Sequence, residues 1–462
     1  MGRQTFYDPL SPTDAWFLYA ERPETPLDIG TVFIFEEAAS VPGRRGLGEL
    51  EERIAARLSM VPRYRQKIHR ARFQVGHPVW VDDPYFDLGY HVRHEYLPPP
   101  GDGATFRATV ARILQRPLDM RRPLWDMTVV HGIRGGRIAL VNRAHHAMVD
   151  GVSSADILTV LMDLTPEGDG SVAPPEPWVA RPAPSTLKLM VPLIRSRFRR
   201  GAGSHSFRRR WAFWRFPYGG MLSLITNMYR PAPDLFFNRK LGLQRTGRGV
   251  KVPLAQFKAL KESAGGTVND VVLGVVAEAM HGWLVERGER LPNSVKVFCP
   301  VSVREEDEHG ALGNKVSGMV FDLPLADMTF PERVQRISRT TGDLKRNRQA
   351  VAAQRLAALG GWAPARLMVL SGRVMPNQQG GANINVTNVP GPQFPLYCGG
   401  AQLLETWPFA PLYPHMGLGI AVVSYNGDVY FGISADGGVV PDADAFARHL
   451  DRAARAATRP AA

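Results

Sequence analysis

Apolar residues recur along the chain at helical spacing in two segments. Residues 47–62 read LGELEERIAARLSMVP, an amphipathic pattern that Pro62 ends. Residues 267–288 carry a second helical stripe of apolar positions, and Thr267 and Asp270 have the spacing of a capping box at its start. Both segments are therefore predicted to be helices that pack one face against a core.

A different pattern, with apolar runs on both sides of a glycine-rich turn, predicts a β-hairpin. One strand covers about residues 125–131, the turn covers 132–136, and the return strand covers 137–144. Folding the hairpin about this turn places Leu124 roughly opposite Ala144. The segment before the first strand is therefore expected beside the residues that follow the second.

The second half of the chain contains further strand signals. Residues 419–436 are predicted to form a hairpin that turns at Asn426 and Gly427, a pair typical of two-residue turns. Residues 382–392, ANINVTNVPGP, alternate polar and apolar positions before two prolines end the pattern. Helix and strand signals thus mix in this half as they do in the first.

A proline-rich and basic stretch separates the two halves. Residues 173–192 hold too many prolines for a regular helix or a central strand. We therefore predict an α/β protein with an N-terminal domain at 1–182, a connector at 183–240 and a C-terminal domain at 241–462.

The net charge of +13 is concentrated in this connector. Residues 187–230 contain ten Lys or Arg and no acid, and the remainder of the chain has 46 bases against 43 acids. Cations interleaved with aromatic rings suit the interface between lipid headgroups and acyl chains. They also suit single-stranded nucleic acid, and a solvated linker is the third interpretation. The candidates for surface binding are Arg208, Arg209, Arg210, Trp211 and Trp214.

Composition excludes several classes of protein. The hydrophobic fraction of 44% and the charged fraction of 21% are ordinary for a globular protein. Two cysteines, Cys299 and Cys398, imply no disulfide framework and favour a reducing compartment. The uncharged run at 216–229 is too short to span a bilayer, and the N-terminus lacks the apolar core of a signal peptide.

The candidate chemistry lies at the end of the first hairpin, in the stretch HHAMVDG. His145 and His146 are followed by Asp150 and Gly151. A histidine with an unperturbed pKa near 6.5 can accept a proton at working pH, so His146 is a candidate general base in a cleft between the halves. A metal site is the weaker reading because no further ligand cluster or CxxC occurs, and a serine hydrolase is disfavoured because no GxSxG occurs.

HHAMVDG resembles the HHxxxDG motif of the chloramphenicol-acetyltransferase-like superfamily of CoA-dependent acyltransferases. Other segments narrow the resemblance to the bacterial wax ester synthase/acyl-CoA:diacylglycerol acyltransferase family, from about Leu10 to Asp436. The segment TNVPGP and the composition rich in Arg and Ala are most similar to those of actinobacterial triacylglycerol synthases. The segments that carry the resemblance are LSPTDAWFLYAE, WVDDPYFDLGYHV, RRPLW, TVNDVVLGVV, PVSVRE, LGNKVSGMVFDLP and TNVPGP.

This resemblance implies two chloramphenicol-acetyltransferase-like domains with a tunnel between them. His146 matches the catalytic base, and His145 matches a partner histidine that shapes the site. Asp150 matches the motif acid, which holds its loop through an arginine, with Arg65 and Arg304 as candidates. Gly151 would let the backbone pass close to the tunnel.

Several other residues match family motifs near the active site. Asn269, Asp270, Thr387 and Asn388 are candidates for the lining of the tunnel or for stabilising the thioester oxyanion. The alternative is that the first pair only caps a helix and the second pair only closes a strand. The segment Pro123, Leu124 and Trp125 is expected to shape the wall beside His145 without a catalytic role.

The resemblance also implies the substrates. Acyl-CoA is expected as acyl donor and substrate, with diacylglycerol or a long-chain alcohol as acceptor and with no cofactor, metal or nucleic acid. The connector would bind a membrane or lipid-droplet surface, so a cytoplasmic protein at the inner face of the membrane is expected. The alternatives are a related acyltransferase acting on a polyketide- or glycolipid-type alcohol, and a non-catalytic lipid-binding protein. Oligomeric state is not predicted.

Overall fold

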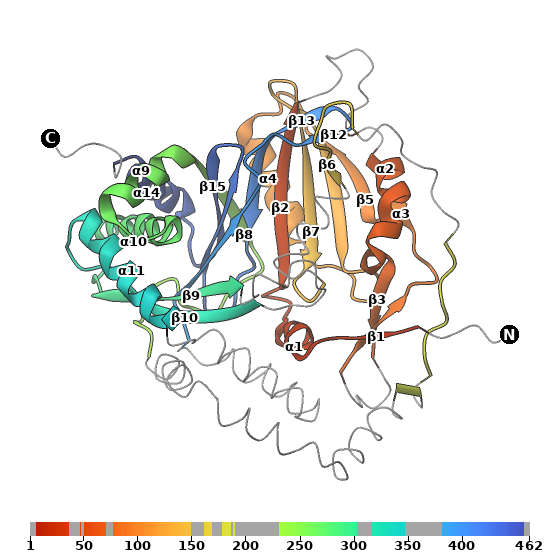
Figure 1. Cartoon of the computed structure of the whole chain (residues 1–462), viewed down its shortest axis with the longest axis horizontal. Coiled ribbons are helices and arrows are strands. Elements are labelled where there is room, and N and C mark those ends of the chain that lie inside the picture. The colour runs from red at the N-terminus through yellow and green to blue at the C-terminus, as the bar shows by residue number, and fades with distance from the viewer. Residues whose placement is uncertain are drawn as a thin grey trace, which may run out of the picture.

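The strands of the chain form two six-stranded sheets and one three-stranded sheet within the residues that its computed structural model describes. The two large sheets lie side by side, each with its own helices (Figure 1). The described residues are 6–36, 47, 50–70, 77–148, 161–168, 178–185, 188–189, 231–302, 316–346 and 381–456.

The first large sheet is built around the predicted hairpin. Its order is β12 (Tyr397–Cys398), β13 (Ala401–Phe409), β2 (Asp28–Glu36), β7 (Arg137–His145), β6 (Trp125–Ile133), β5 (Val92–Tyr96). The hairpin prediction is confirmed by β6 and β7. The register differs by one residue, because Trp125 and not Leu124 lies opposite Ala144. An irregularity between Val130 and Ile133 shifts the pairing near the turn.

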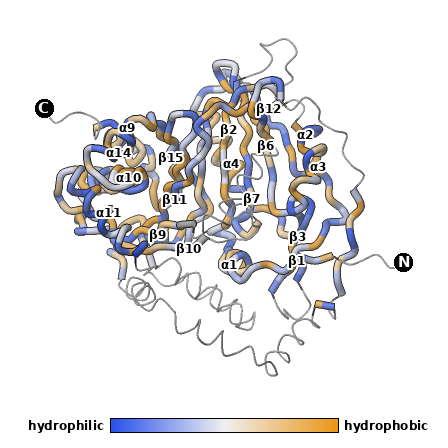
Figure 2. The backbone as a smooth tube through the Cα atoms, in the orientation of Figure 1, coloured by the Kyte–Doolittle hydropathy of each residue, from blue (hydrophilic) through white to orange (hydrophobic). Residues whose placement is uncertain are grey.

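Apolar side chains cover both faces of this sheet, as the orange stretches of its strands indicate in Figure 2. One face packs against α4 (Gly103–Gln115) through residues such as Val32 and Ile113. The other packs against α1 (Pro12–Ala20) and α2 (Leu50–Arg57) through residues such as Phe33 and Ile54. The helix predicted at 47–62 is confirmed by α2 over residues 50–57, but it ends at Arg57, ahead of Pro62.

Shorter elements complete the first half. Two 3-10 turns, η3 (Leu58–Met60) and η4 (Pro62–Arg65), follow α2 and lead into the small sheet. That sheet has the order β1 (Asp8–Pro9), β4 (Val79–Asp82), β3 (Gln66–His69), and α3 (Leu88–His91) precedes β5. Proline at position 62 is tolerated because it stands at the first position of its turn.

The second large sheet mixes parallel and antiparallel pairs. Its order is β10 (Val316–Pro324), β9 (Ser294–Ser302), β11 (Ile384–Pro390), β14 (Leu418–Tyr425), β15 (Asp428–Asp436), β8 (Arg245–Pro253). The predicted hairpin is confirmed by β14 and β15, and its turn residues Asn426 and Gly427 have φ values of 45° and 87°. Both values lie in the left-handed region that such turns require.

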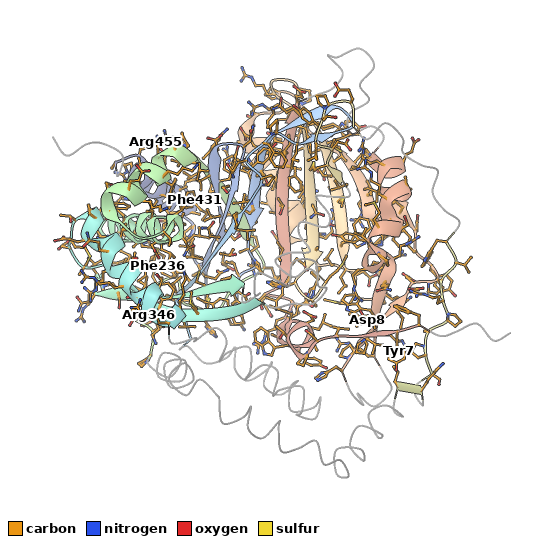
Figure 3. All side chains as sticks on the ribbon, viewed as in Figure 1. Tyr7, Asp8, Phe236, Arg346, Phe431 and Arg455 are labelled. Atoms are coloured by element: carbon orange, nitrogen blue, oxygen red, sulfur yellow. The ribbon has the colours of Figure 1, made fainter. Side chains whose placement is uncertain are left out.

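Four helices pack against this sheet: α9 (Leu254–Ala264), α10 (Val268–Glu286), α11 (Phe330–Arg346) and α14 (Ala443–Ala456). The predicted helix at 267–288 is confirmed by α10. This helix is long and apolar enough to cross a membrane by length and composition, but 67% of its apolar window is buried inside the protein. In Figure 3, Phe431 lies within the second half, whereas Arg346 and Arg455 lie at its outer edge.

Two strands of the second half, β12 and β13, belong to the sheet of the first. β13 pairs antiparallel with β2, although more than 360 residues separate the two in the sequence. The hydroxyl groups of Tyr425 and Tyr430 donate hydrogen bonds to the carbonyls of Leu403 and Leu404 on β13, at 3.0 and 3.2 Å. The C-terminal domain expected at 241–462 thus contributes its residues 397–409 to the sheet of the first half. This strand pairing joins the two halves.

Candidate active site

The two histidines stand where β7 leaves the sheet. The His145 amide donates to the carbonyl of Leu124, and the His146 amide donates to the carbonyl of Leu27, each at 2.9 Å. The Met148 amide then donates to the carbonyl of His145 at 2.8 Å, which closes a turn. Both neighbouring strands therefore fix the backbone that carries the imidazoles, and the segment before β6 lies beside them as expected.

The side chain of His145 is fully buried and faces inward. Its Nδ1 accepts a hydrogen bond from the Ala147 amide at 3.0 Å. In the neutral ring the proton consequently lies on Nε2. That nitrogen faces a carboxylate oxygen of Glu21 at 3.6 Å.

Asp28 completes a buried cluster with these two residues. The register of β2 and β7 places it opposite His145, and the polar atoms of Glu21, Asp28 and His145 lie within 4.8 Å of one another. Burial raises the pKa of the Asp28 carboxyl to about 6, although the nearby His145 and Arg143 lower it. Such a trio has the composition of a cation site, but the tautomer set by Ala147 aims a proton and not a lone pair at it.

His146 presents a different environment. Its ring stacks on Phe17 of α1, with centroids 3.9 Å apart and planes inclined by 14°. The residue is half-buried, so its ring is only partly accessible. A ring held in one plane by stacking, on a backbone held by Leu27, is suited to proton transfer at a fixed position.

The segment Pro123, Leu124 and Trp125 forms a buried wall next to the histidines. The Trp125 indole donates to the carbonyl of Tyr64 at 2.8 Å and stacks on His91, with ring centroids 4.5 Å apart. Leu124 and Trp125 are 0% and 1% exposed. These contacts hold the wall in place, and the absence of a catalytic role for the segment stays a prediction.

The structure brings together two of the four residues expected from the second half. Asn388 on β11 donates through Nδ2 to Oδ1 of Asn269 in the first turn of α10, at 3.2 Å. Thr387 is half-buried on β11 opposite Ala421. The hydrogen bonds among the described residues do not link this group to His146.

Asp270 has a structural role. Its carboxylate accepts hydrogen bonds from the amide and hydroxyl of Thr267, both at 2.8 Å, and from the Thr341 hydroxyl of α11 at 2.8 Å. The predicted capping box is confirmed. A buried carboxylate occupied in this way has no donor to offer an oxyanion, so the oxyanion role considered for Asp270 does not fit its contacts, whereas its place in the tunnel lining stays a prediction.

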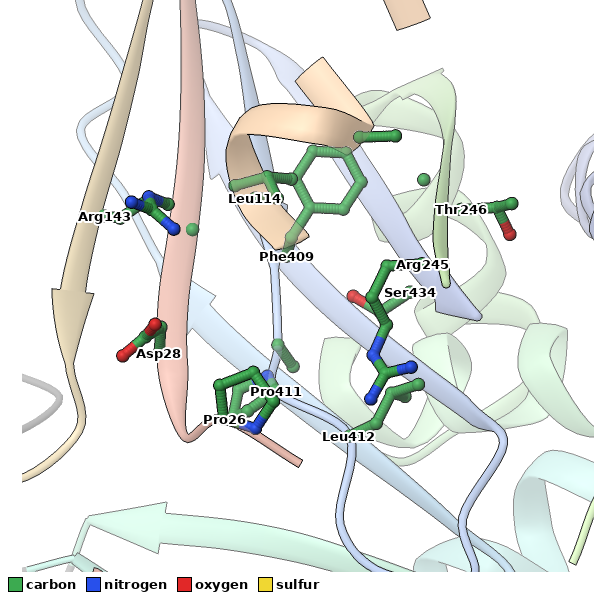
Figure 4. A pocket seen from close by; sticks show the side chains of 14 residues that line it. Pro26, Asp28, Leu114, Arg143, Arg245, Thr246, Phe409, Pro411, Leu412 and Ser434 are labelled. Atoms are coloured by element: carbon green, nitrogen blue, oxygen red, sulfur yellow. The ribbon is translucent and has the colours of Figure 1, made fainter. Parts of the chain in front are cut away.

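A pocket lies between the two halves, next to the buried cluster. In Figure 4, Asp28 and Arg143 of the first sheet stand on one side, and Arg245 and Ser434 of the second half stand on the other. Much of the lining is apolar: Pro26, Gly30, Ala111, Leu114, Phe409, Ala410, Pro411 and Leu412. The arrangement agrees with an interdomain cavity that an apolar group can enter.

Arg245 ties the two halves together beside this pocket. Its guanidinium donates to a carboxylate oxygen of Asp436 at 2.8 Å and to the carbonyl of Glu24, in the loop that leads from Glu21 to Asp28. The arginine therefore connects the second sheet with the segment that carries the carboxylates of Glu21 and Asp28.

Several predicted residues lie outside the described part of the chain. They are Asp150, Gly151, Arg304, Arg208, Arg209, Arg210, Trp211 and Trp214. Of the two arginines considered for Asp150, Arg65 is described, and its guanidinium lies over the ring of Trp178, 4.7 Å from the centroid. The pairing of Asp150 stays a prediction.

Three residues at the site were not expected from the sequence: Phe17, Glu21 and Asp28. Phe17 stands in the apolar run of a helix, where a core role is the ordinary interpretation. Asp28 precedes the apolar run of β2, where an acid is typical of a turn. Their positions relative to His145 and His146 follow from the pairing of β2 with β7 and the packing of α1, which no local pattern contains.

Two family models match most of the chain. The wax ester synthase/diacylglycerol acyltransferase catalytic domain matches residues 10–272, and the WS/DGAT C-terminal domain matches residues 312–456. A probable diacylglycerol O-acyltransferase of Mycobacterium tuberculosis, tgs1, is 29% identical over 96% of this chain and 94% of its own length. A second, tgs2 of the same organism, is 28% identical over 96% and 97%.

Solved structures agree on the fold. The wax ester synthase/diacylglycerol acyltransferase from Marinobacter aquaeolei superposes with a TM-score of 0.66 at 23% identity, covering 97% of this chain and 98% of that one. The first condensation domain of the calcium-dependent antibiotic synthetase superposes with a TM-score of 0.62 at 18% identity, covering 99% and 97%. The expected architecture of two acyltransferase-like α/β domains is confirmed.

Proposed function

The chain belongs to the wax ester synthase/diacylglycerol acyltransferase family, and on this premise we propose that it transfers a long-chain acyl group from acyl-CoA to diacylglycerol. The products are triacylglycerol and free CoA. Long-chain alcohols are the second acceptor class and would give wax esters. The matched mycobacterial relatives are named as diacylglycerol O-acyltransferases, which favours diacylglycerol.

The proposed reaction uses the imidazole of His146 as its general base. His146 accepts the proton of the acceptor hydroxyl while the hydroxyl oxygen attacks the thioester carbon. The tetrahedral intermediate then expels the CoA thiolate, which takes the proton from the imidazolium. Ester and free CoA leave, and neither an acyl-enzyme nor a net proton change is required. No cofactor or metal takes part in this scheme.

The observation that carries this proposal is the position of His146. Its backbone is held by Leu27, its ring is stacked on Phe17, and it directly follows β7, whose Arg143 lines a pocket shared by both halves. General-base assistance from such a fixed group is typically worth about 10²- to 10⁴-fold in rate.

An acceptor-competition assay tests the proposed function. Purified protein receives palmitoyl-CoA with equal concentrations of diolein and hexadecanol, and the lipid products are resolved by chromatography while thiol release is followed. We expect triacylglycerol to exceed wax ester. Thiol release without either ester would identify a thioesterase, and ester formed only with a glycolipid- or polyketide-type alcohol would assign the chain to another acyltransferase activity. Absence of both products and thiol would leave a non-catalytic lipid-binding protein.

The connector supports a proposal about location. A water-insoluble acceptor resides in a membrane or a lipid droplet, and a basic aromatic segment suits such a surface. We therefore place the protein peripherally on the cytoplasmic face of the membrane or on lipid droplets, where acyl-CoA is available.

Vesicle binding tests that location. Each basic residue near an anionic surface contributes about 1 kcal/mol of binding free energy. The triple variant Arg208→Glu, Arg209→Glu, Arg210→Glu should therefore bind phosphatidylglycerol vesicles at least about 100-fold more weakly. A matched variant reverses three exposed arginines of α11: Arg336, Arg339 and Arg346. Equal loss in both variants would show a general charge effect, and no loss in the connector variant would remove the proposed surface.

A further inference from the structure

The buried cluster of Glu21, Asp28 and His145 has polar atoms that the fold leaves unpaired. Within the described residues, neither carboxylate oxygen of Asp28 nor Nε2 of His145 has a hydrogen-bond partner. Buried polar atoms are nearly always paired, and each exception costs about 1–3 kcal/mol. A charged side chain kept at such a cost, beside the proposed base, calls for a functional reason.

We propose that Asp28 is a positioning residue that acts through His145 to hold His146. The inference rests on the proposed acyltransferase function. Asp28 stands opposite His145 on the neighbouring strand, so the two side chains share one face of the sheet. Its carboxylate and that of Glu21 place negative charge where the Nε2 proton of His145 points.

The charge beside His145 affects the turn that carries His146. Negative charge at Nε2 favours the tautomer with its proton there, and that tautomer leaves Nδ1 free to accept the Ala147 amide. Moving the proton to Nδ1, or adding a second one, breaks this hydrogen bond. His146 lies between the two bonded residues, so its backbone would lose one of the contacts that fix it.

Neighbouring charges do not replace Asp28 in this task. Arg143, on the same strand as His145, is committed to Asp126, with Nε donating to its carboxylate at 2.8 Å. The groups that face Asp28 are therefore His145 and Arg143 on β7, Glu21 after α1, and Asp126 on β6. Of these, only Glu21 also directs a carboxylate at Nε2 of His145.

The isosteric variant Asp28→Asn separates positioning from structure. Removing a buried charge should raise thermal stability at pH 7.5, since burial raises the pKa of this carboxyl. The same change should lower kcat by about 10- to 100-fold with little change in KM, the scale expected when a catalytic group moves by about 1 Å. A structural role predicts instead that stability and activity fall together.

The pH profile gives a second readout. The pKa of the Asp28 carboxyl is about 6, so in the wild type kcat should fall steeply below pH 6, where this carboxylate takes up a proton. In Asp28→Asn the acid limb of log kcat should be less steep, by about one unit of slope. Glu21→Gln should reproduce part of the effect, and Glu95→Gln, on the edge strand of the same sheet, serves as the matched control.

The experiment measures kcat, KM, melting temperature and pH slope for the wild type, Asp28→Asn, Glu21→Gln and Glu95→Gln with palmitoyl-CoA and diolein. Lower kcat with higher melting temperature and a reduced slope in Asp28→Asn would support the inference. Wild-type kcat and slope in that variant would overturn it, and so would a parallel loss of stability and activity. An inactive wild type would instead refute the proposed function.

Discussion

Two adjacent histidines have different surroundings, because they contact different groups. His145 is enclosed by Ala147, Glu21 and Asp28, and its ring organises the turn. His146 is half-buried and stacked on Phe17, and it is the residue that we propose as the general base. Residue type alone would assign both the same chemistry, and the difference lies in the hydrogen bond at Nδ1 of the first ring.

The pKa of Asp28 predicts a specific dependence of stability on pH. Because the folded-state pKa is about 6 and the ordinary value is 3.8, the folded state holds more protons between these values. The contribution of Asp28 to the unfolding free energy therefore falls as pH rises from about 4 to 6 and then stays constant. The full shift is worth about 3 kcal/mol.

Urea unfolding of the wild type and Asp28→Asn across this range measures the contribution. The variant should gain stability over the wild type by an amount that grows from near zero at pH 4 to about 3 kcal/mol above pH 6.5. A difference that does not change with pH would show that the Asp28 carboxyl titrates normally.

At the scale of elements, the N-terminus of α10 joins two helices. Asp270 caps its own helix through Thr267 and binds Thr341 of α11. The neighbouring Asn269 binds Asn388 of β11. The first turn of α10 thus contacts both α11 and β11. Its Asp270 serves as a helix cap.

Loss of this cap should affect stability and not catalysis. Asp270→Ala removes the capping box and leaves the Thr341 hydroxyl without its partner, so the unfolding free energy should fall by about 2 kcal/mol. Asp343→Ala, at an exposed position of α11, is the control. Unchanged stability with a reduced kcat would return Asp270 to the active site.

Local patterns could predict both hairpins, α10 with its capping box, and the histidines at the end of β7. They could not predict that β13 would leave its own half to pair with β2, because alternation identifies a strand but not its partner. Asp28 was missed for the same reason. Its proposed role depends on His145, a cross-strand neighbour more than 100 residues away in the sequence.

At the scale of the whole molecule, the pairing of β13 with β2 of the other half holds the two sheets together. β13 lies close to β15, and Gly432 permits this approach, since a Cβ there would lie 1.5 Å from the carbonyl oxygen of Pro408. Trp407 meets Tyr430 edge to face, with ring centroids 5.1 Å apart. The pocket beside Asp28 depends on this junction because its lining comes from both halves.

A methyl group at this contact should therefore weaken the junction. Gly432→Ala places a carbon against backbone that cannot move freely, and we expect a loss of about 2–4 kcal/mol in unfolding free energy together with lower soluble yield. Gly381→Ala, where no atom lies within 4 Å of the added carbon, is the matched control. Equal stability of the two variants would contradict the close approach of β13 and β15.

The central claim is that His146 removes the proton of the acceptor hydroxyl. The most direct measurement is the single-turnover rate of triacylglycerol formation from palmitoyl-CoA and diolein in His146→Ala, with His94→Ala as the control and melting temperature as the check on folding. We predict a loss of about 10²- to 10⁴-fold in the first variant and wild-type rates in the second. Wild-type rates in folded His146→Ala would contradict the mechanism.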